Sequence, residues 1–467
     1  MQTIERDLAI EFDPALIRKL DRTGPRYTSY PTADRFVEAF DAEAYKQCAR
    51  RRAVGALHRP LSLYVHLPFC DTLCYFCACN KIITKDHQRS ARYVDYLKRE
   101  LALQAELFDE NPEVLQMHWG GGTPTFLSES EMRDLMAAIR SRFQLAPDTR
   151  GEYSIEIDPR KADAATIEML RDIGFNRLSF GVQDFDPDVQ RAVNRWQPEA
   201  QTVAVIDAAR RARFHSISVD LIYGLPQQTV ASFDNTLSKI IALSPDRIAL
   251  YNYAHLPTIF KPQRRINEAD LPAPDAKLEI LRLAIAKFSA AGYVYIGMDH
   301  FAKPGDELAI AQRQGRLHRN FQGYSTHAEC DLIALGVSAI GKLPGAYSQN
   351  VRTLDDYYDR LDRGMLPVMR GLELTSDDLI RWAIIQALMC HFELAKESIE
   401  IAYLIDFDRY FARELAELEV FVDDGLLQLD DGISVTPKGR LFVRNICMVF
   451  DRYLRADRER ERYSKVI

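Results

Sequence analysis

The sequence predicts an α/β protein: an incomplete parallel (β/α) barrel followed by a mostly helical C-terminal domain. Two observations carry this prediction. Short β-type runs alternate with amphipathic helical stretches through the middle of the chain, and polar, glycine or ligand-type residues follow successive runs. The alternation indicates βαβ units and a parallel sheet. Functional residues at many strand ends favour a barrel over a doubly wound sheet, which would concentrate them at one switch point.

The expected strands are seven short runs, at 63–66, 116–119, 153–157, 177–182, 216–222, 247–253 and 293–298. The helical stretches between them lie at 91–108, 129–142, 164–173, 200–212, 232–243 and 275–290. A cysteine-rich segment follows the first run, a glycine triplet follows the second, and Asp299 and His300 follow the seventh. We therefore expect the active site at the carboxyl ends of the strands.

Three domains are predicted. Residues 1–55 carry the polar loop GPRYTSYPTA and are expected to form an N-terminal loop and helical extension over the active site. Residues 56–365 form the partial barrel, and residues 366–467 form a helical, winged-helix-like domain. Within the last domain, helices are expected at 374–389 and 399–418, before the strand–turn–strand–helix pattern DGLLQLDDGISVTPKGRLFVRNIC. Such modules can bind nucleic acid, but the acidic first strand favours a structural lid.

Charge and hydropathy exclude several classes of protein. The chain has 467 residues and a formal net charge of −7, so no overall attraction to nucleic acid or anionic membranes is expected. No apolar run approaches the roughly 18 residues of a transmembrane helix. The N-terminus, MQTIERDLAIEFD, has charges where a signal peptide needs an apolar core. We therefore expect a cytoplasmic protein with no membrane span.

Four of the eight cysteines fall within ten residues: Cys70, Cys74, Cys77 and Cys79. A reducing compartment disfavours disulfides, so this cluster indicates metal or redox chemistry. The spacing C-x3-C-x2-C-x-C lets three thiolates hold three corners of a cubane iron–sulfur cluster. Structural zinc usually takes two C-x2-C pairs, and no second pair exists here. The sequence favours a 4Fe-4S cluster with one open iron, with zinc as the alternative.

These motifs resemble the radical S-adenosylmethionine superfamily, in which an aromatic residue such as Phe76 precedes the third cysteine and a glycine-rich stretch such as WGGGTPT follows the next strand. Further motifs resemble the oxygen-independent coproporphyrinogen III oxidases of bacteria: SLYVHLPFC, CYFCACNKI, SIEIDPR, NRLSFGVQDF, DLIYGLPQQT, NYAHLPTIF, GMDHFA, HRNFQGY and KGRLFVRNIC. The resemblance extends from GPRYTSYP to the C-terminal RERYSKVI.

The resemblance implies a set of site residues. The cluster ligands would be Cys70, Cys74 and Cys77, while Cys79 would be a catalytic residue that does not bind the cluster. The family is known for two S-adenosylmethionine molecules side by side. The implied cofactor contacts are Tyr64, Phe76, Gly121, Gly122, Thr123, Glu156, Gln183, Arg195, Asp220, Ala254 and Ile340. Taken alone, Asp220 is as consistent with a helix cap as with a ligand, and Arg195 would most simply form a surface ion pair.

The implied substrate is coproporphyrinogen III, whose ring A and B propionates are decarboxylated to vinyls by a 5′-deoxyadenosyl radical, giving protoporphyrinogen IX in haem biosynthesis. The resemblance also implies an electron donor for the cluster, and we expect a monomer. Four propionates require fixed cations, and HRNFQGY is the favoured loop. The candidates are Arg26, Lys261, Arg264, Arg265, His300, Arg319 and Arg444.

Two other functions remain as alternatives. A haem chaperone of the same superfamily keeps the cluster and barrel but lacks the C-x-C ending and the GPRYTSYP loop, and both are present here. A zinc protein with a nucleic-acid-binding winged helix is disfavoured by the net charge and by the missing second cysteine pair.

Overall fold

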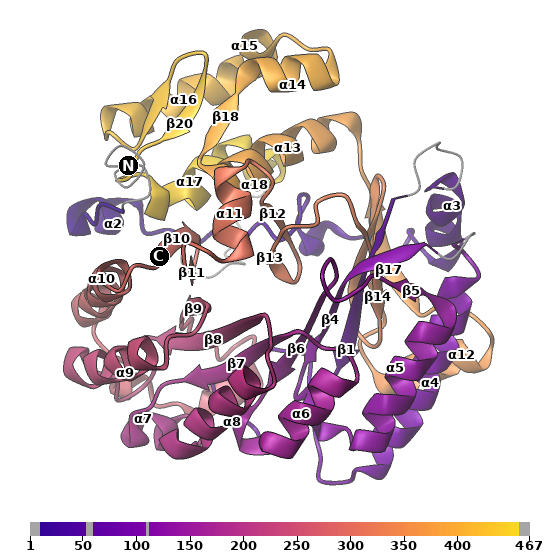
Figure 1. Cartoon of the computed structure of the whole chain (residues 1–467). Helices are drawn as coiled ribbons and strands as arrows, with labels where there is room; N and C mark the ends of the chain where they lie inside the picture. Colours follow the sequence, from indigo (N-terminus) through magenta and orange to yellow (C-terminus); the bar gives the residue numbers. More distant parts are fainter. Residues whose placement is uncertain (1–9, 53–58, 109–111, 457–467) are drawn as a thin grey trace.

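A computed structural model describes residues 10–52, 59–108 and 112–456 (Figure 1). Three stretches named in the sequence analysis lie wholly or partly outside the described ranges. They are the C-terminal RERYSKVI, residues 53–55 of the predicted N-terminal extension, and residues 1–9 of MQTIERDLAIEFD. One large curved sheet forms the centre, in the order β10-β11-β9-β8-β7-β6-β4-β1-β14-β15-β16-β17, with the short β5 (Gln144–Leu145) paired to β4. Its two end strands do not pair with each other, so the barrel is open, as predicted.

The central part of the sheet is parallel. Its strands are β9 (Arg247–Asn252), β8 (Ser216–Tyr223), β7 (Arg177–Gln183), β6 (Glu152–Ile157), β4 (Glu113–Gly121), β1 (Leu61–Leu67) and β14 (Asp331–Leu335). The first six of the predicted runs are found here. In β6, β7 and β8, buried and partly accessible residues alternate, because successive side chains point to opposite faces of the sheet. Glu156, Gln183 and Asp220 occupy partly accessible positions.

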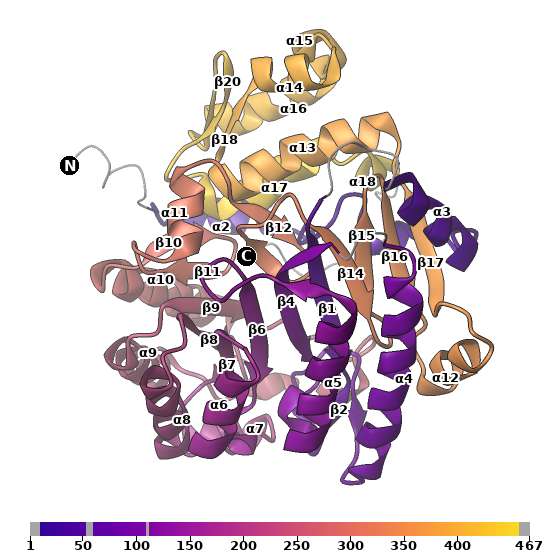
Figure 2. The same ribbon diagram turned by 45° about the vertical axis from the view of Figure 1, so that its right-hand side comes forward.

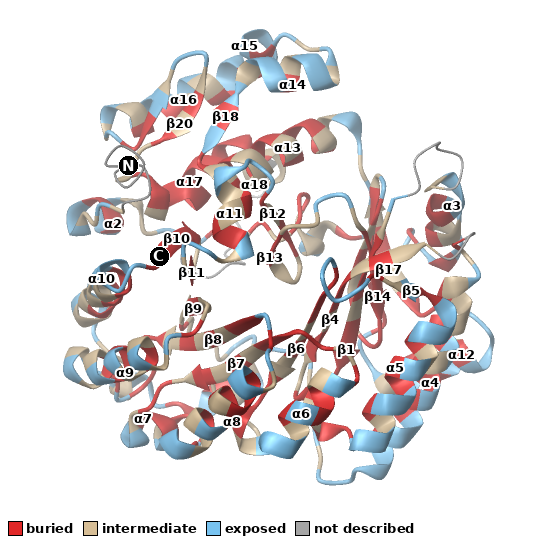
Figure 3. Cartoon of the chain, in the orientation of Figure 1, coloured by how far each residue is buried: buried red, intermediate tan, exposed pale blue. Residues whose placement is uncertain are grey.

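Helices cover the outer side of the parallel strands (Figures 1 and 2). They are α4 (Gln88–Ala105), α5 (Glu129–Arg142), α6 (Ala164–Asp172), α7 (Pro187–Ala192), α8 (Glu199–Arg211), α9 (Val230–Leu243) and α10 (Pro274–Ala290). Helix α5 begins with a capping box formed by Ser128 and Glu131, which satisfies backbone donors at its first turn. The strands are largely buried, and the outward faces of the helices are exposed (Figure 3).

Both ends of the sheet are antiparallel, which the sequence did not indicate. The seventh predicted run forms β10 (Val294–Gly297), but β11 (His300–Ala302) lies between it and β9, antiparallel to both. A parallel crossover needs a helix-length connection, and only Met298 and Asp299 separate these two strands. The other end adds β15 (Ile340–Leu343), β16 (Ala346–Asn350) and β17 (Val368–Glu373). The division at residue 365 stays a prediction, and β17 lies on its C-terminal side.

The C-terminal elements gather at the top of the molecule in both ribbon views. They are α13 (Ser376–His391), β18 (Glu393–Ala395), α14 (Lys396–Tyr403), α15 (Phe407–Tyr410), α16 (Ala412–Asp423), β19 (Leu427–Leu429), β20 (Gly432–Val435), α17 (Val443–Cys447) and α18 (Arg452–Ala456). The single helix expected at 399–418 is wrong: α14 ends where Leu404 adopts a left-handed backbone with φ 54°. The expected strand–turn–strand is present as β19 and β20.

The N-terminal segment lies against these C-terminal elements. It contains α2 (Pro14–Leu20) and α3 (Ala42–Arg52). The Tyr27 hydroxyl donates to Asp451 at 3.0 Å, and Val37 forms a β-bridge with Gly371 of β17. The remaining elements are α11 (Glu307–Arg313), α12 (Leu354–Asp362), the hairpin of β12 (His318–Asn320) and β13 (Gly323–Ser325), and the pair of β2 (Phe69–Cys70) and β3 (Ile82–Ile83). No described helix has the length and apolar character needed to cross a membrane.

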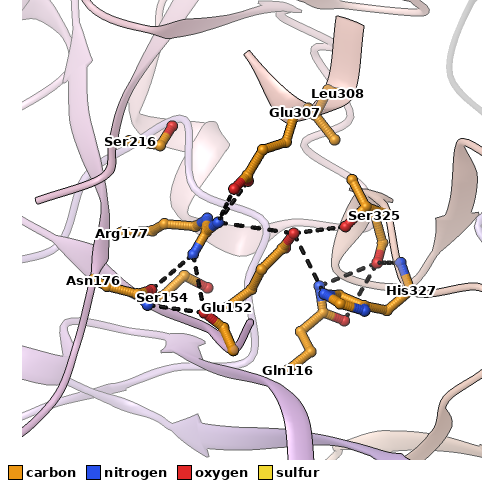
Figure 4. A network of polar contacts seen from close by, with 12 residues as sticks. Gln116, Glu152, Ser154, Asn176, Arg177, Ser216, Glu307, Leu308, Ser325 and His327 are labelled. Atoms are coloured by element: carbon orange, nitrogen blue, oxygen red, sulfur yellow. Dashed lines mark hydrogen bonds and ion pairs between the residues drawn. The ribbon is translucent and has the colours of Figure 1, made fainter. Parts of the chain in front are cut away.

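A polar network closes the amino ends of the parallel strands (Figure 4). Arg177, at the start of β7, pairs with Glu307 at 2.5 Å and donates to Asn176 at 2.8 Å. Glu152, at the start of β6, accepts from Thr326 at 2.6 Å. These charges neutralise one another within the network, which fits a stabilising role at this end of the barrel. The candidate site must be sought at the opposite, carboxyl ends.

Candidate active site

Two adjoining cavities lie at the carboxyl ends of the parallel strands. The first, of about 340 Å³, is lined by all four clustered cysteines and by residues from the ends of β4, β6, β7, β8 and β9. The second, of about 270 Å³, is lined by Tyr64 of β1, the segment after β14, and the turn between β12 and β13. Cys79, Gly121 and Glu156 line both. The arrangement offers two binding spaces that meet at a shared wall.

The cysteine loop is fixed at both ends. Strands β2 and β3 pair in parallel, so Cys70 lies beside Ile83 and the loop between them is closed. Inside the loop, Cys77 N donates to Cys74 O at 3.3 Å, and Lys81 Nζ donates to Cys77 O at 2.9 Å. Tyr75 N donates to Val193 O at 3.0 Å, which ties the loop to the end of α7. The thiols are therefore presented to the cavity from a constrained backbone.

The surroundings differ among the three thiols expected to be ligands. Cys74 Sγ accepts from Arg195 Nη1 at 3.5 Å and from Arg160 Nη2 at 3.7 Å. A hydrogen bond between Cys79 and Cys77, with Lys81 nearby, lowers the pKa of Cys77 to about 6. Burial raises the pKa of Cys70 to about 11, although the hydrogen bond that its sulfur accepts from Thr123 at 3.4 Å acts to lower that pKa. A bound metal deprotonates a coordinating thiol, so Cys70 is compatible with the same role.

Glu156 is held as a carboxylate in the wall between the cavities. It accepts from Gly121 N at 3.0 Å and contacts His118 Nε2 at 3.3 Å. Burial acts to raise the pKa of Glu156, but His118 and the Gly121 amide outweigh it and hold the pKa below its ordinary value. Gly121 has φ +114° and lies against the His66 ring, so a side chain at this position would be strained and obstructed.

A second group of charges lies beside Cys74. The Asp158 carboxylate pairs with Arg160 at 2.6 Å and with Arg195 at 3.4 Å. Arg195 is buried and also donates to Gly181 O at 2.6 Å, so the surface ion pair considered for it is wrong. Asp220 lies within β8 and accepts from Ser179 rather than capping a helix. Burial and the charge of Glu156 raise the pKa of Asp220 to about 7.

The first cavity retains hydrogen-bonding capacity that the described residues do not use. Gln183 Oε1 and Arg195 Nε are buried without a hydrogen-bond partner among the described residues. Gln183 has a left-handed backbone, φ 70°, at the end of β7, a conformation that is uncommon outside glycine and often marks a functional position. Several thiols beside unsatisfied polar groups and carboxylates fit an iron–sulfur cluster together with a polar, zwitterionic ligand.

The structure brings together ten of the eleven cofactor residues expected from the sequence. Tyr64 and Ile340 line the second cavity, and the others line the first, with Gly121 and Glu156 in both. The exception is Ala254, just past β9, which lines neither. Their binding roles stay predictions. Lining residues outside the expected set are Thr72, Lys81, Ile157, Asp158, Arg160, Ser179, Gly181 and Tyr251 in the first cavity, and His66, Asn80, Phe321, Gln322, Ser338 and Ala339 in the second. Alternation along β7 could have indicated Ser179 and Gly181, which share a face with Gln183.

The candidate cations separate into two groups. Lys261, Arg264 and Arg265 lie on the exposed 3-10 helix η4 (Lys261–Arg265), and none lines either cavity. The other four are brought together beside Tyr251 of the first cavity, through contacts among the N-terminal segment, β11, β12 and α17. They are Arg26, His300, Arg319 and Arg444.

Comparisons with known proteins agree with this geometry. A model of the radical SAM superfamily matches residues 64–240, and a model of the HemN C-terminal domain matches residues 374–442. The oxygen-independent coproporphyrinogen III oxidase of Pseudomonas aeruginosa is 53% identical, covering 98% of this chain and 99% of its own. That of Escherichia coli is 50% identical over the same shares. The solved structure of coproporphyrinogen III oxidase (HemN) from Escherichia coli, described as a radical SAM enzyme, matches with TM-score 0.91, 49% identity, and coverage of 96% of this chain and 100% of that one.

Proposed function

The chain belongs to the oxygen-independent coproporphyrinogen III oxidases of the radical SAM superfamily, and on that premise we propose that it decarboxylates the ring A and B propionates of coproporphyrinogen III to vinyl groups. Each vinyl requires a propionate to lose one hydrogen atom, one carbon dioxide and one electron. The observation that carries this proposal is the cavity in which four cysteines face the ends of five parallel strands. A structural zinc site would not need such an open space.

The family implies a 4Fe-4S cluster and S-adenosylmethionine, and the residues present fit both. When bound, they supply a one-electron reductive cleavage that yields a radical able to take a hydrogen atom from carbon. We assign Cys70, Cys74 and Cys77 as the cluster ligands. Arg160 and Arg195 both donate to the sulfur of Cys74.

For S-adenosylmethionine, we assign the other lining residues of the first cavity. Glu156 and Asp220 offer carboxylates to an amine or to ribose hydroxyls, and Gln183 Oε1 offers an unused acceptor. Arg195 suits a carboxylate. The remaining predicted contacts there are Phe76, Gly121, Gly122 and Thr123.

We propose that a second S-adenosylmethionine occupies the second cavity. Support comes from the two adjoining spaces and their common wall of Cys79, Gly121 and Glu156. Tyr64 and Ile340 line the second space. To Cys79, which is solvent-accessible and lines both spaces, we assign the role of holding or moving a proton at its Sγ. The hydrogen bond with Cys77 and the charge of that residue raise the pKa of Cys79 well above the ordinary thiol value.

Anaerobic turnover tests the function. Purified protein with its cluster is mixed with coproporphyrinogen III, S-adenosylmethionine and a strong one-electron reductant. The expected result is protoporphyrinogen IX with two 5′-deoxyadenosine molecules per fully decarboxylated product. A ratio of one would contradict consumption of one S-adenosylmethionine per vinyl, and haem binding without any vinyl formation would support the haem chaperone instead.

A further inference from the structure

A group of basic side chains, of which Arg319 and Arg444 are buried, converges beside the first cavity. The Arg26 guanidinium lies over the ring of Tyr251, 5.7 Å from its centroid, and Tyr251 lines that cavity. Arg319 of β12 donates through Nε to Arg26 O at 3.4 Å and lies over the Tyr324 ring at 4.7 Å. The ring of His300 packs edge-on against both tyrosines, at 6.0 Å and 5.3 Å. Residues from three distant parts of the chain thus meet at one place.

Three arginines of this group, Arg26, Arg319 and Arg444, lie close enough to influence one another, and three carboxylates surround them. Asp299 pairs with Arg26, and the other acidic groups facing the cluster are Asp21, toward Tyr223, and Asp220, toward Tyr251. Burial and then the charge of Arg319 lower the pKa of Arg26. Burial and then the charge of Arg26 lower the pKa of Arg444 to about 9. Gathering like charges in a buried place is costly unless an anion joins them.

The arginines have different tasks. Arg444 donates through Nε to Pro25 O at 3.0 Å and also to Gly24 O, so it holds the backbone that carries Arg26. Arg319 also donates to this segment, through Nε to Arg26 O, but its Nη1 is buried without a hydrogen-bond partner among the described residues. His300 Nδ1 is also buried without a hydrogen-bond partner among the described residues, and it can donate or accept according to the tautomer of the ring. A buried donor without an acceptor costs about 1–3 kcal/mol, so an acceptor supplied by a ligand would stabilise the Nη1 of Arg319.

We propose that Arg26 and Arg319, with His300 beside them, bind a propionate carboxylate of the substrate, and that Arg444 is a positioning residue that holds Arg26 in place. The proposal rests on the proposed function, because it takes the tetracarboxylate coproporphyrinogen III as the ligand. Guanidinium groups match carboxylates with two parallel hydrogen bonds. Contact between Arg26 and Tyr251 places the anchored carboxylate next to the cavity in which we locate the cofactor.

Binding of coproporphyrin III, the oxidised and unreactive form of the substrate, tests the proposal by fluorescence titration of the cluster-containing protein. Arg26→Gln and Arg319→Gln should each raise its Kd by about tenfold or more, the loss expected for a charge-assisted hydrogen bond. Arg26→Lys should retain part of the affinity, since it keeps the charge. Arg264→Gln, an exposed arginine on η4, is the matched control and should bind like the wild type.

Two further measurements separate the possible outcomes. Iron content and substrate-free formation of 5′-deoxyadenosine should not change in the glutamine variants, because these depend on the cysteine cavity. The melting temperature reports how far each variant loses the structural contacts of Arg26 and Arg319. The proposal is overturned if both glutamine variants bind within about twofold of the wild type. It is also overturned if affinity falls only together with the melting temperature and Arg26→Lys restores neither. Wild-type protein that binds coproporphyrin III but never converts coproporphyrinogen III would instead refute the proposed function.

Discussion

Cys74 and Cys79 share one loop, but their surroundings differ. Cys74 is buried, and Arg160 and Arg195 both donate to its sulfur. Cys79 is solvent-accessible, lines both cavities and shares a hydrogen bond with Cys77. A sulfur that accepts from two guanidiniums suits a metal ligand, and a thiol between two binding spaces suits a role in turnover. The two residues should therefore differ when each is replaced by serine.

Cys74→Ser should lose the visible absorbance of the cluster, its iron and the cleavage of S-adenosylmethionine together. A serine hydroxyl is harder and far less acidic than a thiol, so it is a poor ligand for an iron–sulfur cluster. Iron per chain and 5′-deoxyadenosine formation are the measurements. Cys330→Ser is the control, since Cys330 lines neither of the two cavities and should leave both quantities unchanged.

Cys79→Ser should keep its iron near the wild-type level while product formation falls. If Cys79 also bound iron, all four corners of the cubane would be occupied and no iron would remain for the cofactor. Iron per chain is measured beside product formation. Loss of the cluster as complete as in Cys74→Ser would make Cys79 a ligand and refute the open-iron mechanism, and full activity would remove its catalytic role.

At the scale of elements, Glu100 joins helix α4 to the wall of the second cavity. Its carboxylate is fully buried and accepts from Tyr357 Oη at 2.5 Å, Gly336 N at 2.7 Å and Asn350 Nδ2 at 2.7 Å. Gly336 begins the segment that leads to Ser338, Ala339 and Ile340. One side chain thus fixes α12, β16 and this segment relative to α4.

Glu100 should make the unfolding of the protein depend on pH. Burial raises the pKa of Glu100 to about 7, although the hydrogen bonds that its carboxylate accepts act to lower that pKa. The folded protein therefore keeps a proton that the unfolded chain releases above pH ~4.3. Stability from this group is fully present below that pH, and about 3 kcal/mol of it is lost as the pH rises through 7.

Glu100→Gln does not titrate, so its melting temperature should fall less between pH 5 and pH 8 than that of the wild type. Thermal unfolding under anaerobic conditions at these two pH values measures the difference. Glu419→Gln, an exposed glutamate of α16, is the control and should follow the wild type. An equal fall in Glu100→Gln and the wild type would show that Glu100 has an ordinary pKa.

The attachment of the N-terminal segment depends on Arg444 of α17. Arg444→Met removes the donor for the carbonyls of Gly24 and Pro25, a loss of about 1–3 kcal/mol. The segment should open more often, so trypsin should cleave after Arg22 about tenfold faster. Arg409→Met, at an exposed position of α15, is the control. Cleavage at the wild-type rate would show that the other contacts of the segment, such as Tyr27 with Asp451, hold it without Arg444.

Over the whole molecule, the sequence predicted what contiguous residues encode. The functional residues of the cysteine loop lie within a few residues of one another, and so do those at the carboxyl end of each of β4, β6, β7 and β8. Spacing and alternation along the chain were therefore sufficient to predict them. The antiparallel ends of the sheet were missed because β11, β15 and β16 are short and each follows the strand before it without an intervening helix. Leu404 breaks an otherwise helical pattern without glycine or proline. The local sign of the break is Asp406, whose side chain caps α15 by accepting from Arg409 N.

Contacts between segments that lie far apart in the sequence could not be predicted from the sequence alone. Seven cations were candidates for the propionates, and the fold separates them by bringing Arg26 and Arg444 to Arg319 while leaving Arg264 on the surface. Polar residues in β12 and its turn were assigned to substrate alone, yet Phe321 and Gln322 line the second cavity. Such groupings follow from tertiary packing and not from spacing along the chain.

Sensitivity to oxygen should be a property of the assembled molecule. The cavity is open enough to leave Cys79 solvent-accessible, and a cluster with three cysteine ligands has one iron without protein ligation. Air should therefore bleach the visible absorbance and release iron, and iron plus sulfide should restore both under anaerobic conditions. Saturating S-adenosylmethionine should slow the bleaching, because it would cover the open iron. S-adenosylhomocysteine lacks the sulfonium charge, so it tests whether filling the cofactor site is enough to protect the cluster. Absorbance and iron per chain that survive days in air would contradict an open iron in this cavity.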